Sequence, residues 1–271
     1  MAYAQMLRER FPEITLHAED LLLLEAFQIQ YLPDRVAEKE FAILLRAYPV
    51  VHRYLVARCP SIAASLNELL DETRENRPAA GSPQAGEQIQ EALWEIADLI
   101  IYNKYPELFD QKGRIHWDIS EIASITSLEG KIVADVGAGS GRIAFLVSPY
   151  ARSVFAIEPV TALRSFMKDK AREGKVRNMY VMDGTLDALP LPSDSLDVLI
   201  TSNAIGWNLQ EELKEIERVV QTGGHAIHLI HSDPQRDNPL HESLTSEPWH
   251  YDFIQDTTEA SIKTRYYKRI Q

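Results

Sequence analysis

A glycine-rich turn is the first place in this 271-residue chain where residue types and spacing could do chemistry. Gly137, Gly139 and Gly141 directly follow a short run of apolar, β-branched residues. Glycine permits a tight exit from a strand, close approach of a ligand to the backbone and close packing of the next helix. The dinucleotide spacing G-x-G-x-x-G would need glycine where this chain has Arg142, which counts against NAD and FAD.

Two acidic residues follow, each at the end of a strand-like run. Glu158 lies 17 residues after Gly141, and its carboxylate could accept hydrogen bonds from both hydroxyls of a ribose. Asp183 could accept from an exocyclic amine while the next backbone N–H meets a ring nitrogen. Each also has a plainer interpretation, a helix-starting glutamate for Glu158 and a turn aspartate before Gly184 for Asp183. The strand–helix–strand spacing favours the binding role for Glu158.

A polar run completes this pattern. Residues 189–207 combine a proline-punctuated loop, an acidic strand start and a small polar end. Thr201–Asn203 fall at the carboxyl end of a predicted central strand, beside the point where α/β proteins bind ligands.

Alternating strand and helix patterns must position these residues. Runs of β-branched residues predict strands at 132–136, 153–157, 178–181, 195–201 and 225–231. Helical spacing predicts helices at 141–148, 160–173 and 209–220, and Asp118-x-x-Glu121 predicts a capping box. Alternation implies a parallel sheet with right-handed crossovers. Two final runs, 249–255 and 261–270, predict a C-terminal hairpin.

The chain before this pattern is predicted to be helical, giving a helical region at 1–116 and an α/β domain at 117–271. Apolar residues recur at helical spacing over 20–32, 35–58 and 87–102, and residues 77–86 predict a mobile loop with two prolines and two glycines. Because the region is too long for one leading helix, we expect a cap that supplies acceptor specificity.

Composition limits the classes of partner and compartment. Apolar residues make up 45% of the chain and charged residues 25%, as in ordinary globular proteins. The net charge of -12 argues against nucleic acid, whose backbone needs basic residues. Cys59 is the single cysteine, which fits a reducing cytoplasm. The N-terminus has no signal-peptide segment and no run reaches membrane length, so we expect a cytoplasmic protein without a membrane partner.

Four segments in order carry a family resemblance: VADVGAGSG, VFAIEP, DGTLDALPLPSDSLDVLITSNAI and LKEIERVVQTGGHAIHLI. The set resembles class I S-adenosylmethionine-dependent methyltransferases and is most similar to the branch of the ubiquinone/menaquinone-biosynthesis methyltransferases. The resemblance runs from about residue 115 to the C-terminus. It implies a Rossmann-like, seven-stranded, mostly parallel sheet of order 3-2-1-4-5-7-6, and S-adenosylmethionine as the cofactor.

The resemblance also implies a role for each residue of the glycine turn. Asp135 and the backbone of Gly137, Ala138 and Gly139 would face the methionine portion of the cofactor. Glu158 would hold the ribose.

Its remaining implied contacts lie around the adenine and the methyl group. Pro159 would border the adenine pocket. Asp183 and the backbone of Gly184 and Thr185 would bind adenine. Asn203 would close the site near the reacting methyl group.

The chain departs from the family pattern in two places. Ile205, Gly206 and Trp207 stand where many relatives have an aromatic or histidine pair. The span 232–248 is too short and broken for the usual long fifth crossover helix. We therefore expect an open acceptor pocket, or one closed by the N-terminal helices.

Methyl transfer from a sulfonium is an in-line displacement with a neutral leaving group, so the protein mainly aligns the reactants and excludes water. A general base is needed only if the acceptor must lose a proton. Among candidate catalytic residues His231 is best placed, although a strand-end histidine is more often structural; the others are His228, Trp207, Tyr102, Tyr105 and Trp117. The histidines near 225–231 lack a carboxylate at ligand spacing, so no metal is expected.

The leading hypothesis is methyl transfer to a small-molecule acceptor. One alternative is a regulatory or inactive relative that binds the cofactor without transfer, and a less favoured one is an NAD-dependent oxidoreductase. A basic protein acceptor is a further alternative. The sequence names neither the acceptor atom nor the oligomeric state, and an exposed helical cap is compatible with a homodimer.

Overall fold

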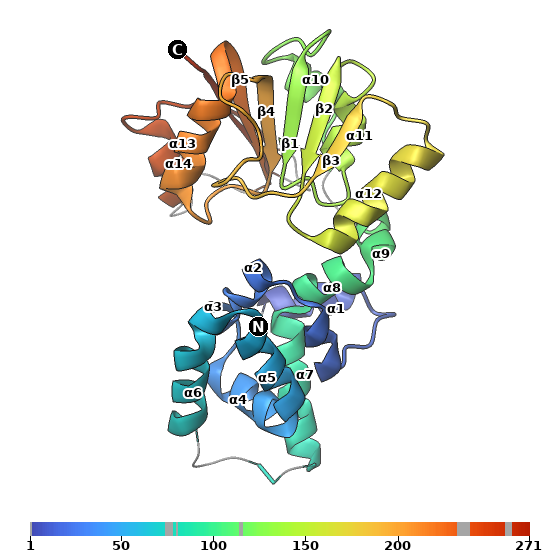
Figure 1. Ribbon diagram of the computed structural model, residues 1–271, viewed down its shortest axis with the longest axis vertical. Helices are drawn as coiled ribbons and strands as arrows, with labels where there is room; N and C mark the ends of the chain where they lie inside the picture. The colour runs from blue at the N-terminus through green and yellow to red at the C-terminus, as the bar shows by residue number, and fades with distance from the viewer. Residues whose placement is uncertain (1, 74–77, 80, 114–115, 232–238, 258–261) are drawn as a thin grey trace. The chain divides into compact units, whose positions relative to one another are not determined.

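Two units, Met1–Lys112 and Gly113–Gln271, make up the chain in the computed structural model (Figure 1). The structure describes residues 2–73, 78–79, 81–113, 116–231, 239–257 and 262–271. The first unit is helical and the second is an α/β sandwich of helices on a sheet.

The N-terminal unit is built from short helices. They are α1 (Ala2–Arg10), η1 (Ala18–Leu23), α2 (Ala26–Ile29), α3 (Leu32–Arg35), α4 (Glu38–Ala47), α5 (Pro49–Arg58), η2 (Pro60–Ile62), α6 (Ala63–Glu72), α7 (Pro83–Glu95), α8 (Ala97–Lys104) and α9 (Pro106–Gln111).

The apolar spacing over 35–58 and 20–32 does not mark single helices. Pro49 begins α5 and ends α4 at Ala47, because proline has no N–H to donate and its ring clashes with the preceding turn. Within 20–32 the backbone is extended at Leu24, with φ -69° and ψ 140°. The helical spacing of apolar residues thus continues in the sequence across positions where the backbone is not helical.

Two further boundaries differ from the sequence prediction. The stretch 87–102 is divided at Ile96, whose φ of -119° and ψ of 18° separate α7 from α8. The predicted loop 77–86 overlaps helix α7, which begins at Pro83. Ser82 caps this helix by accepting a hydrogen bond from Ala85 N at 3.2 Å.

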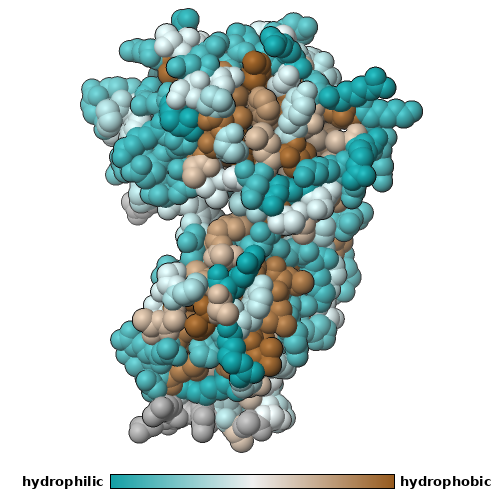
Figure 2. Space-filling view, in the orientation of Figure 1, coloured by the Kyte–Doolittle hydropathy of each residue, from teal (hydrophilic) through white to brown (hydrophobic). Residues whose placement is uncertain are grey.

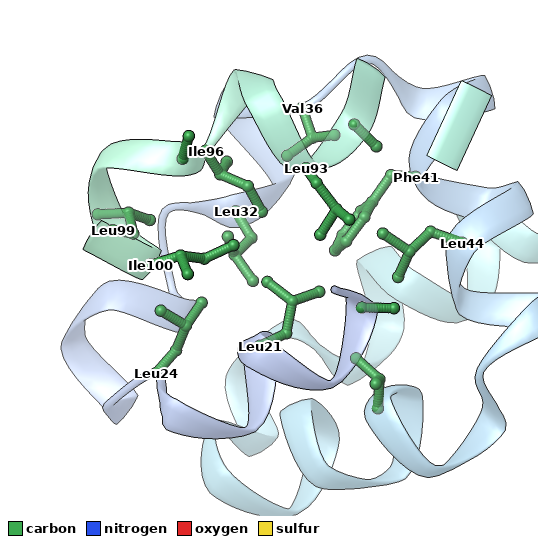
Figure 3. Close-up of a cluster of buried hydrophobic side chains, with 14 of the residues drawn as sticks. Leu21, Leu24, Leu32, Val36, Phe41, Leu44, Leu93, Ile96, Leu99 and Ile100 are labelled. Carbon is green, nitrogen blue, oxygen red and sulfur yellow. The ribbon is translucent and has the colours of Figure 1, made fainter. Parts of the chain in front are cut away.

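One apolar cluster forms the core of this unit (Figure 3). Side chains from α3, α4, α7 and α8 meet those of η1 in it. Its labelled members are Leu21, Leu24, Leu32, Val36, Phe41, Leu44, Leu93, Ile96, Leu99 and Ile100, all buried. The unit therefore has a core of its own, separate from the cores that flank the sheet.

The second unit holds a seven-stranded sheet of order β3-β2-β1-β4-β5-β7-β6, which confirms the predicted topology. The strands are β1 (Ile132–Val136), β2 (Ser153–Ile157), β3 (Met179–Met182), β4 (Leu196–Ser202), β5 (Val220–Ile230), β6 (Asp252–Thr257) and β7 (Ile262–Arg269). Strands β1 to β5 pair in parallel, and β7 is antiparallel to both β5 and β6. The carboxyl ends of the five parallel strands thus meet at one edge.

Helices cover both faces of the sheet (Figure 1). Strand residues such as Val133 and Ile227 pack with α10, α11 and α12, whereas Ala134 and Leu199 pack with α13 and α14. These helices are α10 (Ile119–Ala123), α11 (Arg142–Val147), α12 (Thr161–Glu173), α13 (Leu209–Val219) and α14 (Pro239–Thr245). In the described part of 232–248, α14 is only seven residues long, so the long fifth crossover helix of the family is not present there.

Strand β5 begins five residues before the predicted His225. Gly223, at φ 85°, lets the strand turn, and the pairing with β4 shifts register between Leu196 and Val198. A Cβ at Gly224 would lie 2.7 Å from Asp197 O, so the chain approaches β4 more closely here than a side chain allows.

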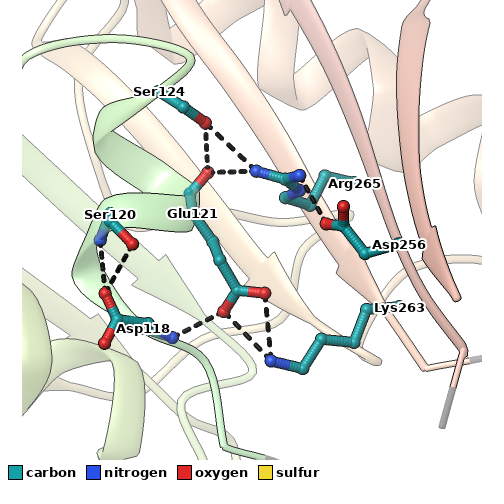
Figure 4. A network of polar contacts seen from close by, with 7 residues as sticks. All are labelled: Asp118, Ser120, Glu121, Ser124, Asp256, Lys263 and Arg265. Atoms are coloured by element: carbon teal, nitrogen blue, oxygen red, sulfur yellow. Dashed lines mark hydrogen bonds and ion pairs between the residues drawn. The ribbon is translucent and has the colours of Figure 1, made fainter. Parts of the chain in front are cut away.

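Ion pairs hold α10 against the C-terminal hairpin (Figure 4). Glu121 completes the predicted capping box by accepting from Asp118 N at 2.6 Å, and its carboxylate also accepts from Lys263 Nζ at 3.0 Å. Arg265 Nη1 donates to Glu121 O at 2.8 Å and Arg265 Nη2 bonds Asp256 at 2.5 Å. The first helix of the α/β unit is thereby tied to its last two strands.

The visible surface of each unit is mostly hydrophilic, with apolar residues gathered in several patches (Figure 2). Among the described residues, no helix combines the length and apolarity that crossing a bilayer requires.

Replacing Glu121 with alanine should lower the free energy of unfolding by about 1–2 kcal/mol, because one change removes a helix cap and a half-buried ion pair. Urea unfolding followed by circular dichroism measures this. Glu129→Ala, at the exposed turn before β1, serves as the control and should change stability by less than about 0.5 kcal/mol. Equal effects of the two substitutions would contradict the bridging role of Glu121.

Candidate functional site

The glycine turn leaves the end of β1 and folds back on the end of β2. Gly137 N and Ala138 N both donate to Ile157 O, at 2.9 and 3.1 Å. Gly137 has φ 68°, and a Cβ there would lie 2.3 Å from the Cβ of Ala204. Only glycine fits this position, since both the backbone conformation and the space exclude a side chain.

Asp135 lies near the end of β1 and is 1% exposed. One carboxylate oxygen accepts from Ala144 N, in the first turn of α11, at 2.9 Å. Burial outweighs the opposing hydrogen bond from Ala144 N and, together with the negative charge of Glu158, raises the pKa of Asp135 to about 7. The turn therefore holds an acid that ionises near neutral pH.

Glu158 follows β2 directly and links the two strand ends. Its carboxylate accepts from Gly139 N at 2.8 Å and from Val160 N at 2.9 Å. The residue is 5% exposed. The alternative interpretation of Glu158 as an exposed glutamate that only starts a helix does not hold, because its carboxylate is buried and accepts from the glycine turn.

Asp183 follows β3 and presents an exposed carboxylate, with 73% of the side chain accessible. Arg164 Nη1 donates to its Oδ1 at 2.9 Å and to Pro159 O at 2.7 Å. Next in the chain, Gly184 packs so tightly that a Cβ would lie 2.7 Å from Pro190 Cδ. Thr185 Oγ1 donates to the Asp187 carboxylate at 2.6 Å, which closes the turn after β3.

Asn203 directly follows β4 and has a left-handed conformation, with φ 52°. Its backbone N donates to Leu229 O at 3.0 Å, and its side-chain Oδ1 accepts from His231 N at 3.0 Å. Asn203 and His231 are both exposed. The structure thus brings these two predicted residues together at the carboxyl ends of β4 and β5.

His228 is a candidate base that the structure places in the core. The side chain is fully buried, and burial lowers its pKa to about 3, so the imidazole is neutral. Its Nδ1 shares a 2.9 Å hydrogen bond with Thr201 Oγ1, and its ring packs 5.0 Å from that of Tyr251. His228 therefore does not reach the edge where a substrate would react.

Trp207 is 57% exposed on the loop between β4 and α13. The buried carboxylate of Glu212 accepts from Gly206 N at 2.7 Å and from Trp207 N and Asn208 N at 3.1 Å. Sequence analysis missed Glu212, although an acidic residue in the first turns of a helix is a usable signal. The Glu212 carboxylate therefore fixes the backbone of the loop that carries Trp207.

The other aromatic candidates are Trp117 of the α/β unit and two tyrosines of the N-terminal unit. Trp117, just before α10, is 8% exposed, and Lys263 Nζ lies 4.8 Å from its ring centroid. Tyr102 and Tyr105 belong to the N-terminal unit. Among the described residues, no three His, Cys, Asp or Glu side chains form a group that could hold a metal ion.

Comparison with known proteins shows what the α/β unit is similar to. Residues 134–228 match the family model described as "Methyltransferase domain". The uncharacterised methyltransferase YcgJ of Bacillus subtilis is 28% identical over 105 residues, which cover 38% of this chain and 42% of the relative. The probable S-adenosylmethionine-dependent methyltransferase CRG1 of Saccharomyces cerevisiae is 23% identical over 120 residues, covering 43% and 41%.

The chain thus spans about two fifths of the length of these curated relatives. The crystal structure of YcgJ aligns with a TM-score of 0.44 at 16% identity, covering 56% of this chain and 97% of that one.

The raised pKa of Asp135 gives a test by pH. The unfolded chain ionises this carboxyl near pH 4 and the folded chain only near pH 7, so the wild-type protein loses stability across that interval. Asp135→Asn removes the ionisation. Its free energy of unfolding relative to wild type should therefore rise by roughly 1–3 kcal/mol between pH 4.5 and 7.5, measured by urea unfolding. A difference that does not change with pH would refute the raised pKa.

The matched segment covers β1 to β5, with the glycine turn, Glu158, Asp183 and Asn203 inside it. At this coarser level the comparisons agree with the resemblance inferred from the sequence: residues 134–228 of the α/β unit match the model described as "Methyltransferase domain".

Proposed function

We propose that the α/β unit binds S-adenosylmethionine at the carboxyl ends of β1, β2 and β3 and transfers its methyl group to a small-molecule acceptor. The observation that carries this proposal is the Glu158 carboxylate, placed at the end of β2 and bonded to Gly139 N. Ligands of open α/β sheets bind at this edge, and an acid at the end of the second strand suits ribose hydroxyls.

The residues present suit such a cofactor. Each Glu158 oxygen accepts a backbone N–H, and a carboxylate has about four lone-pair sites in all, so it can also accept from ribose hydroxyls. Ser140, inside the glycine turn, has a buried Oγ without a hydrogen-bond partner among the described residues. Asp183 offers an exposed acceptor for an amine. A buried hydroxyl without a partner beside a glycine turn is expected where a polar ligand completes its hydrogen bonds.

In this proposal the glycine turn faces the methionine portion. Asp135 contributes its carboxylate, and Gly137, Ala138 and Gly139 contribute backbone. The ammonium group and the sulfonium of the cofactor are positive, so an acid that ionises near pH 7 gives the turn a matching charge.

The adenine lies, in this proposal, between the turns after β2 and β3. Pro159 borders it, Asp183 accepts from its amine, and the backbone of Gly184 and Thr185 approaches the ring. Asn203 would face the methyl group, and its Oδ1 accepts from His231 N, so that both residues would line the acceptor side.

When bound, S-adenosylmethionine supplies an activated methyl group on a positively charged sulfur. The chain contributes alignment and exclusion of water rather than covalent chemistry. His231 is the proposed base for acceptors that must lose a proton, since it is exposed, whereas the neutral His228 is fully buried in β5. The exposed Trp207 is proposed to line the acceptor side.

The acceptor class and compartment rest on composition. A net charge of -12 disfavours nucleic acid as the acceptor. A single, buried cysteine suits the cytoplasm as the proposed location. A cap role for the helices before residue 117, and the similarity to the ubiquinone/menaquinone branch, stay predictions.

Glu158→Ala should weaken the binding of S-adenosylhomocysteine at least about tenfold, because hydrogen bonds to the ribose hydroxyls are lost. Isothermal titration measures this, with circular dichroism to verify the fold. An analogue without the two ribose hydroxyls should lose far less affinity on the same substitution. Equal losses for the two ligands would contradict the ribose assignment.

Turnover separates an enzyme from a relative that only binds the cofactor. Purified protein with S-adenosylmethionine should release S-adenosylhomocysteine in the presence of one class from a panel of phenols, carboxylic acids, amines and thiols. Binding without turnover on every class would favour the regulatory alternative. No binding of either ligand would overturn the proposal.

A further inference from the structure

We infer that Arg164 is a positioning residue that orients Asp183 and thereby makes the site selective for adenine over other purines. This inference rests on the proposed function and deepens it. Arg164 lies in the first turns of α12 and its side chain is 13% exposed. Neither the glycine turn nor the acidic strand ends point to it, so sequence analysis passed over it.

The guanidinium of Arg164 donates hydrogen bonds to acceptors in three segments of the chain. Its Nη1 donates to Glu158 O at 2.8 Å, to Pro159 O at 2.7 Å and to Asp183 Oδ1 at 2.9 Å. Its Nη2 donates to Thr161 Oγ1 at 2.9 Å. One planar group therefore joins the turn after β2 to the residue that follows β3.

The arrangement differs from an ordinary surface ion pair. Exposed pairs contribute little because both side chains must be ordered for a screened attraction. Here the guanidinium is already held by two backbone carbonyls, so only the Asp183 side chain remains to be ordered. A rigid fork suits this task, whereas the ammonium of lysine is a single point charge on a flexible stem.

The consequence concerns the second oxygen of Asp183. With Oδ1 held by Arg164, Oδ2 is left as the acceptor that a ligand can meet. Pre-ordering an exposed side chain removes part of the entropy cost of binding. An amine donates to this oxygen, whereas a carbonyl oxygen in its place would meet it acceptor to acceptor. The adenine amine is the group that Arg164 selects indirectly.

Two ligands that differ at the purine 6-position and the adjoining N1 test the inference. S-adenosylhomocysteine carries the amine beside an unprotonated N1, and S-inosylhomocysteine carries a carbonyl oxygen beside an N1–H. Wild-type protein should bind the first at least about tenfold more tightly, the size of one well-placed hydrogen bond. In Arg164→Met this preference should fall to about threefold or less. Arg164→Lys should recover only part of it.

Two controls distinguish the orientation of Asp183 by Arg164 from a purely structural role of Arg164 in helix α12. Arg172→Met changes the same residue type on the same helix, where the side chain is exposed, and should leave the ratio of the two affinities unchanged. In Asp183→Asn, adding Arg164→Met should change the ratio no further. If Arg164→Met folds poorly, Arg164→Lys and Asp183→Asn still give the comparison.

The possible outcomes are separable. Equal weakening of both ligands by Arg164→Met would overturn the inference and leave cofactor binding intact. A wild-type protein that binds neither ligand would overturn both the inference and the proposed function. An Arg164→Met variant that folds normally but no longer prefers S-adenosylhomocysteine over S-inosylhomocysteine supports the inference.

Discussion

The arrangement of loops at the carboxyl edge of the sheet depends on the hydrogen bonds made to one buried carboxylate, that of Glu158. An ionised carboxylate at low exposure is costly unless N–H groups donate to it, and Gly139 N and Val160 N donate to Glu158. The glycine turn and the end of β2 therefore cannot move independently. Arg164 Nη1 also donates to the backbone carbonyl of Glu158 and so holds the turn after β2. The charge of Glu158 also contributes to keeping Asp135 protonated at mildly acidic pH.

Much of the sheet was predictable because its strands are apolar runs with clear punctuation. The ends of β1 and β2 agree with the prediction to the residue, since Gly137 follows one run and Glu158-Pro159 follow the other. The start of β5 was not predictable in the same way. Val220–Gly224 looks like a helix end followed by a turn, and only the pairing with β4 makes it a strand. Breaks in the N-terminal helices were missed because apolar spacing continues across them.

The same distinction, between features marked in the sequence and features fixed by tertiary partners, decides which site residues could be predicted. Residues directly after strands could be found from the order of elements alone. Arg164 and Glu212 lie on helices with many charged neighbours, and their partners are backbone groups of loops whose path the sequence does not reveal. His228 illustrates the opposite problem. In a parallel sheet covered on both faces, strand alternation does not tell a core histidine from an accessible one.

The bond between Thr201 and His228 has a consequence for how the chain reaches this arrangement. The two residues are direct partners across β4 and β5, and both are fully buried. A slip of one residue between these strands would separate them and leave a hydroxyl and an imidazole buried without each other, in an environment where unmade hydrogen bonds are expensive. Apolar neighbours alone would tolerate such a slip more readily. One polar pair in the interior therefore discriminates against misaligned sheets, and it does so two residues before Asn203.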